Sequence, residues 1–553
     1  MTDQKIATQL IGVINEGTST VSFSIHSLPR FEQIIEHRIA IQLISPKEGW
    51  FEQDPLEIME AIHICCQEAC ALLPEFGYTV ANIATIGVTN QRETTVVWDK
   101  FTGKPLYNAL VWKDIRTNTQ VDAMLCKVPG QDKNYYRNIS GVPLSPYFSA
   151  FKIMWLKENV PEVRKACREN TCLVGTIDSW IIWKLTNGQK HITDVTNASR
   201  TMLMNIDTLH WDPVLLKAFK ISSDMLPDIR SCSEIYGRVL DEDSVLEDIP
   251  ISGILGNQQA SLLGQQCVKP GQAKNSYRSG CFLLCNTGQT RVNSKHGLLT
   301  TVAYKLGPNA PTIYALEGSV AVGGHALRWL QSKMRILTDT DEAEPMASSV
   351  RTTGDVYFVP AFTGLYAPYW RKDARGIICG LTQFTTKQHI VRAALESICF
   401  QSRDILECMY QEGGFKISKL HADGTLIGNS LLMQLQADIA GIPVLCSQSS
   451  DPAAIGVAQC AAVAEGINIY NPERDSTGDK TAYSIYVPNN TSDERAHRYA
   501  KWKRAVERSF GWSVKSNPTI SSDQQRLMAS IPPGIYMITV FAMMLHAAWR
   551  RAK

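Results

Sequence analysis

The same order of strands, glycine turns and helices is predicted twice along the chain, and this repeat constrains the fold more than any other feature. Near the N-terminus, alternating apolar residues predict two strands, 11–14 and 21–25, joined by a small-residue turn at Gly17. In the second half, a predicted strand ends at Gly256, a helix-compatible run follows, and residues 276–288 are typical of strand, turn and strand. Because 553 residues are too many for one ordinary core, we predict two similar α/β domains.

Glycine turns at strand ends would place the loops of two such domains face to face across a cleft. A cleft of this kind is a common location for a nucleotide and a small substrate. We predict that the domains cover residues 10–256 and 257–515. The composition then turns polar, which predicts a linker over 516–533, and a hydrophobic tail occupies 534–553.

One helix is predicted with a defined start near residue 54. Asp54 can cap it, Pro55 suits its first turn, and Glu57 lies three residues after the cap. Apolar residues then recur at helical spacing, at Met59, Ile62 and Cys66, and a further strand is predicted around 86–88.

Composition and charge exclude several classes of protein. A formal net charge of +2 gives no basic field, so nucleic acid is not an expected partner. The 15 cysteines include no CxxC pair, and the first residues lack a basic-then-apolar leader, so we expect a reducing, cytosolic environment. Cys281 and Cys285 lie on a strand-like run without a nearby histidine, so we interpret them as packing residues and expect no structural metal.

The C-terminal tail has an unusual composition. Residues 527–549 contain no Asp, Glu, Lys or Arg, and Arg550, Arg551 and Lys553 follow at once. As a helix, the apolar part from Gly534 would span about 24 Å, short of the roughly 30 Å hydrocarbon core. Such a marginal span suits a thin organelle membrane, so we predict an anchor in the mitochondrial outer membrane facing the cytosol. The alternative is a terminal helix docked on the body of a cytoplasmic protein.

Several long stretches resemble one family of kinases. Residues 147–159 and 376–396 match two signature patterns of the FGGY carbohydrate kinases position by position. Four further stretches, 90–99, 175–180, 193–203 and 359–370, narrow the resemblance to the glycerol kinases. The resemblance implies two actin-like, ribonuclease H-like domains flanking a cleft that binds glycerol and Mg-ATP, with sn-glycerol 3-phosphate as product. Homo-oligomers are usual in this family.

The polyol side of the cleft matches the family. By resemblance, two polar residues hydrogen-bond the glycerol hydroxyls, three aromatic residues wall its carbon chain, and one amide adds a polar contact. These residues are Arg92 and Glu93, then Trp112, Tyr147 and Phe282, and finally Gln258. A small triol needs fixed donors and acceptors beside walls that exclude water, and an adjacent Arg and Glu supply both polarities.

The first phosphate loop departs from the family. Where the family resembles DQGTSSTR, this chain has NEGTSTVS, so Asn15 stands at the metal-holding Asp position and Ser22 at the position of the phosphate-contacting Arg. Thr18 and Ser19 keep hydroxyls in the nucleotide-binding turn. Glu16 retains a carboxylate one residue later, but neighbouring side chains of an extended segment point to opposite faces, so we do not expect it to replace the Asp.

The second phosphate loop departs at the general base. The family pattern GDQSAAL is GNQQASL here, so Asn257 occupies the position of the Asp that takes the proton from the attacking hydroxyl. An amide has negligible proton affinity at neutral pH. Loss of the general base alone is expected to lower the rate by roughly 10² to 10⁴.

The nucleotide contacts are partly changed. By resemblance, Ser279 keeps a hydroxyl near the phosphates and Gly324 and Asn429 are retained, whereas Arg278 and Thr425 replace glycines. The Arg278 side chain either fills the phosphate space or turns away, and a cation there could also aid binding of a triphosphate. We expect weakened but not abolished adenine binding.

Two functional hypotheses follow. The first is a membrane-tethered glycerol kinase homologue with little or no turnover, which binds glycerol and presents its surface to mitochondrial outer-membrane proteins. It is motivated by the amides at Asn15 and Asn257, which remove charge where the phosphate transfers. The alternative is an active ATP:glycerol 3-phosphotransferase of glycerol metabolism, slowed by the same changes.

Overall fold

A computed structural model describes residues 9–320, 322–448, 451–472 and 483–513. The predicted linker over 516–533 and the predicted hydrophobic tail over 534–553 lie outside these described residues. Within the described ranges, no helix is both long enough and apolar enough to cross a bilayer.

The first half of the chain is built on a six-stranded mixed sheet. Its strands, in spatial order, are β11 (Ser233–Arg238), β12 (Pro250–Gly256), β5 (Ile83–Asn90), β1 (Leu10–Glu16), β2 (Thr20–Ser27) and β3 (Glu32–Ala40). β1 and β2 pair antiparallel around Gly17, whose N–H donates to the Thr20 carbonyl at 2.9 Å. The predicted hairpin is therefore confirmed. β12, β5 and β1 are parallel to one another, so their carboxyl ends meet at one edge of the sheet.

Two helices make the most extensive contacts with this sheet. The predicted helix is α1 (Pro55–Ala71), which lies against β2 and β3, and the Asp54 carboxylate accepts from the Leu56 N–H at 2.8 Å as its cap. The other is α14 (Pro452–Ala462), which contacts β12, β5 and β1 although it comes from the second half of the chain.

The second half is built on a seven-stranded sheet. Its strands, in spatial order, are β15 (Leu299–Tyr304), β16 (Ile313–Val320), β14 (Cys281–Gly288), β13 (Ala273–Tyr277), β19 (Leu420–Asp423), β20 (Val444–Ser447) and β21 (Tyr483–Tyr486). The predicted strand, turn and strand over 276–288 includes the end of β13 and all of β14, which pair antiparallel. Cys281 and Cys285 are buried in β14, within the core of this half.

Helices and short strands complete the two halves. In the first half they are α2 (Asn118–Leu125), α3 (Arg137–Ser140), α4 (Ser149–Asn159), α5 (Pro161–Arg168), α6 (Ile177–Leu185), α7 (Val195–Ala198), α8 (Pro213–Phe219), β9 (Ile192–Asp194) and β10 (Asp228–Arg230). In the second half they are α10 (Gly324–Ser332), α11 (Ala343–Ser348), β17 (Tyr357–Val359), β18 (Ile377–Cys379), α12 (Lys387–Gly413), α13 (Ser430–Ala440) and α16 (Ser492–Arg508). A separate four-stranded sheet joins β4 (Glu52–Gln53), β7 (Ala109–Leu110), β6 (Thr95–Asp99) and β8 (Cys172–Thr176).

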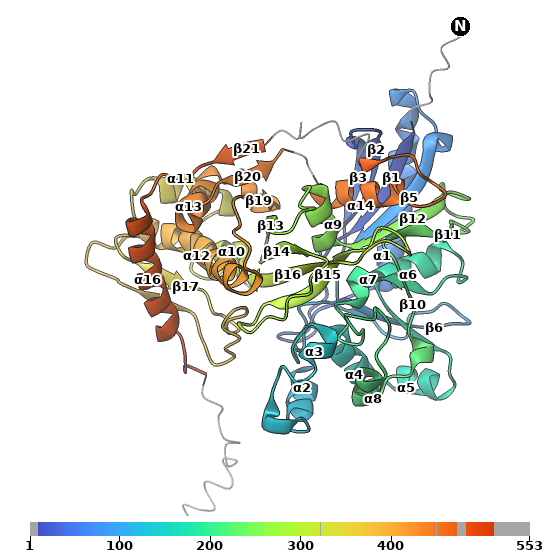
Figure 1. Ribbon diagram of the computed structural model, residues 1–553, viewed down its shortest axis with the longest axis horizontal. Coiled ribbons are helices and arrows are strands. Elements are labelled where there is room, and N and C mark those ends of the chain that lie inside the picture. The colour runs from blue at the N-terminus through green and yellow to red at the C-terminus, as the bar shows by residue number, and fades with distance from the viewer. Residues whose placement is uncertain (1–8, 321, 449–450, 473–482, 514–553) are drawn as a thin grey trace, which may run out of the picture.

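A pair of helices joins the two halves. α9 (Asn257–Gly264) follows β12 and contacts β13, β14 and β15 of the second sheet, and it lies side by side with α14 (Figure 1). Their backbones touch, because a side chain at Gly264 would collide with the Pro452 carbonyl and one at Gly456 with the Ala260 carbonyl. The loops at the carboxyl ends of β1, β5 and β12 therefore lie close to the second half.

Candidate active site

Three aromatic side chains from distant segments meet at this junction. Trp112 follows β7, Tyr147 precedes α4, and Phe282 lies in β14. The Trp112 ring lies 5.7 Å from the rings of both Tyr147 and Phe282 in edge-to-face contacts. Its indole N–H donates to the Thr18 hydroxyl at 2.9 Å, which ties the wall to the Gly17 turn. The structure thus brings together the three residues that the resemblance assigns to the glycerol wall.

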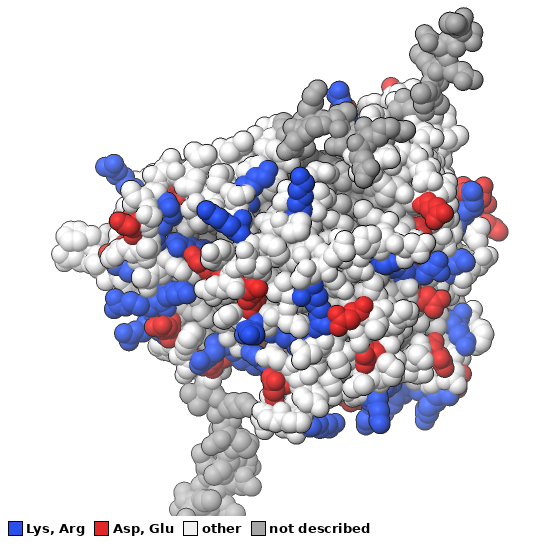
Figure 2. Space-filling model, viewed as in Figure 1, with Lys and Arg blue, Asp and Glu red and all other residues white. Residues whose placement is uncertain are grey.

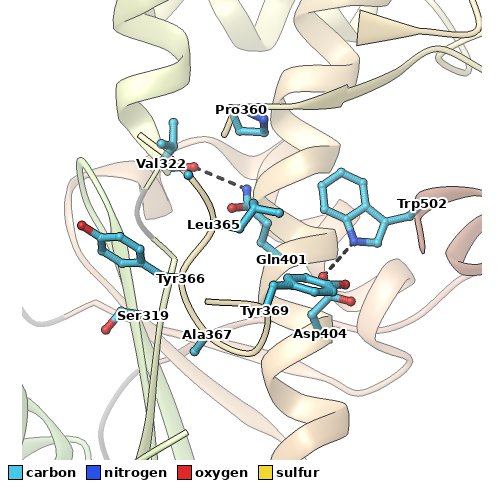
Figure 3. A pocket seen from close by; sticks show the side chains of 11 residues that line it. Ser319, Val322, Pro360, Leu365, Tyr366, Ala367, Tyr369, Gln401, Asp404 and Trp502 are labelled. Atoms are coloured by element: carbon cyan, nitrogen blue, oxygen red, sulfur yellow. Dashed lines mark hydrogen bonds between the residues drawn. The ribbon is translucent and has the colours of Figure 1, made fainter. Parts of the chain in front are cut away.

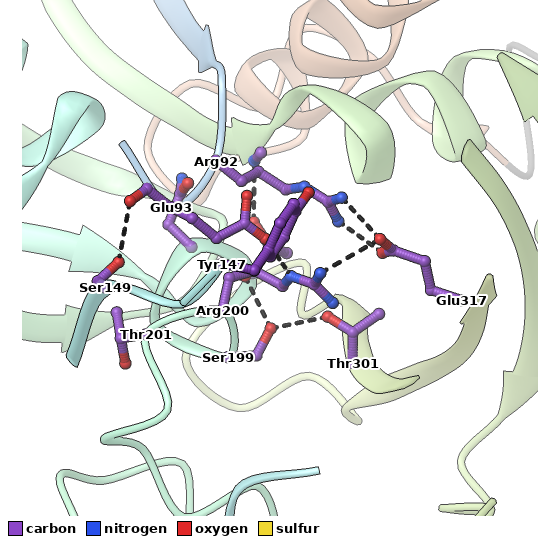
Figure 4. Close-up of polar contacts among 12 residues, drawn as sticks. Arg92, Glu93, Tyr147, Ser149, Ser199, Arg200, Thr201, Thr301 and Glu317 are labelled. Carbon is purple, nitrogen blue, oxygen red and sulfur yellow. Dashed lines mark hydrogen bonds and ion pairs between the residues drawn. The ribbon is translucent and has the colours of Figure 1, made fainter. Parts of the chain in front are cut away.

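A buried network of four charges lies beside Tyr147 (Figure 4). Arg92 donates two hydrogen bonds to Glu317 of β16, at 2.7 and 2.8 Å. Arg200 donates to Glu93 at 2.6 Å and to Glu317 at 3.2 Å. The neighbours Arg92 and Glu93 therefore have different partners, and the positive φ of 61° at Glu93 marks the sharp turn between them. The charges alternate, so the burial of each ion is compensated.

The network keeps the Glu317 carboxylate ionised and leaves one donor of Arg200 without an acceptor among the described residues. Burial opposes the charge on Glu317, but Arg200 and Arg92 together lower its pKa to about 2. Among the described residues, the buried Arg200 Nη1 has no hydrogen-bond acceptor. An unsatisfied buried donor is costly, and a ligand hydroxyl would satisfy it. Sequence reasoning missed Arg200 and Glu317; the only signal for Arg200 was its place in the matched stretch 193–203.

A long-range hydrogen bond joins the first phosphate loop to the second half of the chain. The Asn15 amide donates to the Asp451 carboxylate at 2.5 Å, and the other Asp451 oxygen accepts from the Ala453 N–H at 3.0 Å as the cap of α14. Across the strands, Asn15 pairs with Ser22 and Ser22 pairs with Arg38 of β3. The amide at position 15 is thus a hydrogen-bond donor to a carboxylate from the second half.

Glu16 faces a different set of partners. It is fully buried and accepts from the Gln91 side chain at 2.6 Å. The expected alternation of Asn15 and Glu16 is confirmed, because their side chains bond to segments far apart. Burial, only partly offset by the hydrogen bonds from Gln91, raises the pKa of Glu16 to about 8. This carboxyl group is therefore mostly protonated at neutral pH and does not replace a metal-binding Asp.

The raised pKa of Glu16 predicts a pH-dependent stability. Between its ordinary value of 4.5 and about 8, the folded state binds more protons than the unfolded state, so the free energy of unfolding falls as the pH rises through that window. Glu16→Gln removes this titration. Relative to wild type, we expect the variant to gain on the order of 2–4 kcal/mol between pH 5 and pH 8 in denaturant unfolding. The exposed Glu68→Gln is the matched control, and equal pH profiles for both variants would contradict the assignment.

The second phosphate loop begins α9. Asn257 is the first residue of this helix, directly after β12, and is partly exposed. The next side chain, Gln258, accepts from the buried Lys274 of β13, which also donates to Ser276 at 2.7 Å. Burial lowers the pKa of Lys274 to about 8, although Asp423 and Glu317 oppose that shift. Lys274 is a buried basic residue, bonded to the predicted substrate residue Gln258, that the sequence reasoning missed.

The turn between β13 and β14 packs against the start of α10. The N–H of Gly324 donates to the Arg278 carbonyl at 2.9 Å, and the Ser279 hydroxyl accepts from Arg328. The Arg278 and Ser279 side chains are both exposed. Arg278 replaces a glycine of the family pattern, but because its side chain is exposed, the turn still packs closely against the start of α10.

The third nucleotide-side segment adjoins this turn. Gly424 has a φ of 101°, and a side chain there would collide with the Tyr277 carbonyl. Thr425 follows and is exposed, whereas the Asn429 side chain accepts from the Leu432 N–H at 2.8 Å as the cap of α13. The predicted nucleotide residues Ser279, Gly324 and Thr425 thus lie on adjoining segments, while Ser19 is exposed at the tip of the Gly17 turn.

Basic side chains from both halves lie close together beside this turn. Burial lowers the pKa of Lys113, which follows Trp112, and Arg328 lowers it further. Burial also lowers the pKa of His325, with further contributions from Arg328 and Lys113. Charges that shift one another in this way are close neighbours. The positive potential of Lys113 and Arg328 suits a polyphosphate.

The residues at the Gly17 turn fit a magnesium ion carried mainly by nucleotide phosphates. Mg²⁺ usually takes one or two protein carboxylates together with substrate phosphates. Asp451 provides a carboxylate beside Asn15, which keeps its amide oxygen, and these two residues would hold the ion. In the described parts of the chain, no group of three or more His, Cys, Asp or Glu side chains is arranged to bind a metal.

Comparisons with known proteins agree with this architecture. Residues 10–264 match the N-terminal domain, and residues 273–465 the C-terminal domain, of the FGGY family of carbohydrate kinases. The chain belongs to this family. Within it, the chain is 43% identical to a probable glycerol kinase of Dictyostelium discoideum, over 92% of this chain and 99% of that one. It is 44% identical to a glycerol kinase of Arabidopsis thaliana, over 90% and 97% of the two chains.

Solved structures show the same fold. The crystal structure of Plasmodium falciparum glycerol kinase with ADP matches with a TM-score of 0.83 and 36% identity, covering 91% of this chain and 98% of that one. Gluconate kinase from Lactobacillus acidophilus matches with a TM-score of 0.76 at 21% identity, which indicates the fold alone. The predicted fold of two actin-like, ribonuclease H-like domains is confirmed.

Proposed function

We propose that this protein is an ATP:glycerol 3-phosphotransferase with slow turnover, making sn-glycerol 3-phosphate. The observation that carries the proposal is the buried network of Arg92, Glu317, Arg200 and Glu93 under the aromatic wall, with Arg200 Nη1 still open for a ligand hydroxyl. Relatives named glycerol kinases, at 43–44% identity over most of the chain, favour an active enzyme over an idle one.

The chemistry needs positioning more than it needs a base. In phosphoryl transfer, the bond from the terminal phosphorus to the ADP oxygen breaks as the glycerol oxygen bonds to that phosphorus, and most analyses find a loose transition state. The charge network would orient the hydroxyl and the aromatic wall would exclude water. A bound Mg²⁺ would neutralise phosphate charge. Because Asn257 cannot accept the hydroxyl proton, that proton leaves to the phosphate or to water, and the rate falls by roughly 10² to 10⁴.

A second candidate function is glycerol binding without turnover. It is favoured by one contact, the hydrogen bond from Asn15 to Asp451, which places a neutral donor at the position where the resemblance puts a metal-binding carboxylate. This is the membrane-tethered homologue of the first hypothesis. Its proposed location, the mitochondrial outer membrane facing the cytosol, rests on the composition of residues 527–549, and membrane fractionation of chains with and without residues 534–553 tests it.

Product formation by the purified full chain separates the two functions. At high enzyme concentration we expect ATP- and Mg²⁺-dependent glycerol 3-phosphate, measured by mass spectrometry. Trp112→Ala should raise KM for glycerol at least about tenfold, because it opens the aromatic wall. Glycerol binding in calorimetry without any product would support the second function instead. Absence of glycerol binding would refute both.

A further inference from the structure

A second cavity, of about 350 Å³, lies apart from the glycerol pocket. Its lining comes from the segment leading into α3, the loop before β15, the loop before β18, and the helices α12 and α16. Four of the lining side chains are basic, and no carboxylate is among the described residues that line it. The cations are Lys133, Arg137, Lys295 and Lys503.

Arg137 is a buried guanidinium with an open donor. The residue is 8% exposed, and it donates to the Asn134 side chain at 3.2 Å and to the Leu298 carbonyl. Its Nε has no acceptor within the described residues, and no carboxylate described there lies within ion-pair distance of it. Burial lowers its pKa, and the opposing influence of Glu412 and Asp132 does not cancel that effect. An uncompensated buried cation is costly, so a bound anion would stabilise this site.

The surrounding charges add to this positive potential. Burial, with Arg137 and Lys372, lowers the pKa of Lys133, while Asp132 opposes the shift. Asp132 and Glu412 are nearby acids, and Glu412 accepts from the backbone and ring of His296. Figure 2 shows Lys and Arg side chains on the face between α16 and α3, with several Asp and Glu side chains among them. The cavity therefore has more cations than its neighbouring carboxylates neutralise.

One wall of the cavity is aromatic and rigid. Trp370 donates from its indole N–H to the Gly297 carbonyl at 2.6 Å and stacks on Tyr366. The same loop packs on α12 through Tyr369 (Figure 3), beside Asp404, which accepts from Trp502 at 2.8 Å. Lys133 lies 5.8 Å from the Trp370 ring. An aromatic face beside several cations suits a carbon skeleton that carries an anion.

We propose that this cavity binds the phosphate monoester of a small sugar or polyol. Arg137 and the three lysines hold the phosphate through charge-assisted hydrogen bonds, and Trp370 covers the carbon skeleton. Free phosphate shares the charge but leaves the aromatic wall uncovered. Because the lining segments come from both halves of the chain, the ligand bridges them outside the cleft.

Calorimetric titration of the full chain tests the site with three probes: glucose 6-phosphate, inorganic phosphate and glucose. We expect saturable binding of glucose 6-phosphate, weaker binding of phosphate, and none of glucose. Lys295→Gln with Lys503→Gln neutralises two exposed cations of the cavity and should weaken binding about tenfold. Lys127→Gln with Lys165→Gln changes two exposed lysines elsewhere and should leave binding unchanged.

A variant of the aromatic wall tests whether this site is independent of the glycerol pocket. Trp112→Leu should leave binding of glucose 6-phosphate unchanged. The proposal is overturned if no probe binds saturably, if both double variants weaken binding equally, or if Trp112→Leu abolishes it. Equal affinity for phosphate and for glucose 6-phosphate would overturn the assignment of an organic ligand.

Discussion

Turnover should rise by at least roughly 10² to 10⁴ when five substitutions, Asn15→Asp, Ser22→Arg, Asn257→Asp, Arg278→Gly and Thr425→Gly, are made together. Asn257→Asp alone should gain little, because a general base accelerates transfer only when the phosphate and its metal are already held. The measurement is kcat for glycerol phosphorylation with and without Mg²⁺. Asn257→Leu, placed in the same background of the other four changes, is the matched control and should stay slow.

The structure adds a condition to this result. Asn15 donates to Asp451 at 2.5 Å, so Asn15→Asp brings two carboxylates together. Like charges at that distance cannot both ionise without a cation, so Asn15→Asp alone should lower the thermal stability, and Mg²⁺ should restore part of it. An unchanged kcat for the fivefold variant would show that the rate is limited elsewhere than at these positions.

Glu317→Gln should cost about 3–5 kcal/mol of the free energy of unfolding and abolish glycerol binding. Glu317 bonds to both Arg92 and Arg200 in the buried network, so the substitution leaves two guanidinium groups without their shared anion. These cations hold the pKa of Glu317 at about 2. The contribution of its carboxylate to the free energy of unfolding should therefore persist from neutral pH down to about pH 4.5 and be lost as the pH falls further.

A more exposed pair provides the control for Glu317. Arg238 pairs with Asp248, and their side chains are 55% and 80% exposed, so Asp248→Asn should cost no more than about 1 kcal/mol. Denaturant unfolding of both variants gives the comparison. A loss below about 1 kcal/mol for Glu317→Gln would contradict the view that the network is a compensated buried unit.

Local patterns predicted local structure well. The hairpin around Gly17 followed from alternating apolar residues, and the start of α1 followed from Asp54, since a capping side chain bonds within its own first turn. The opposite directions of Asn15 and Glu16 followed from strand alternation alone. These features depend on neighbours within a few residues, so the sequence contains all the information they need.

The family resemblance named the aromatic wall, but nothing in the sequence predicted the partners of its charges. Arg92 and Glu93 are adjacent, yet each bonds to a residue more than 100 positions away, and Asn15 meets Asp451 across 436 positions. The four cations of the second cavity come likewise from three separate segments.

The sequence by itself determined the strands, the turns, the helix caps and the membership of a kinase fold, because these depend on spacing along the chain. Only the tertiary structure decided which charges neutralise one another. The partners of these charges depend on which segments α9 and α14 bring together when they pack backbone to backbone between the two sheets. Separation along the chain does not predict which segments those are.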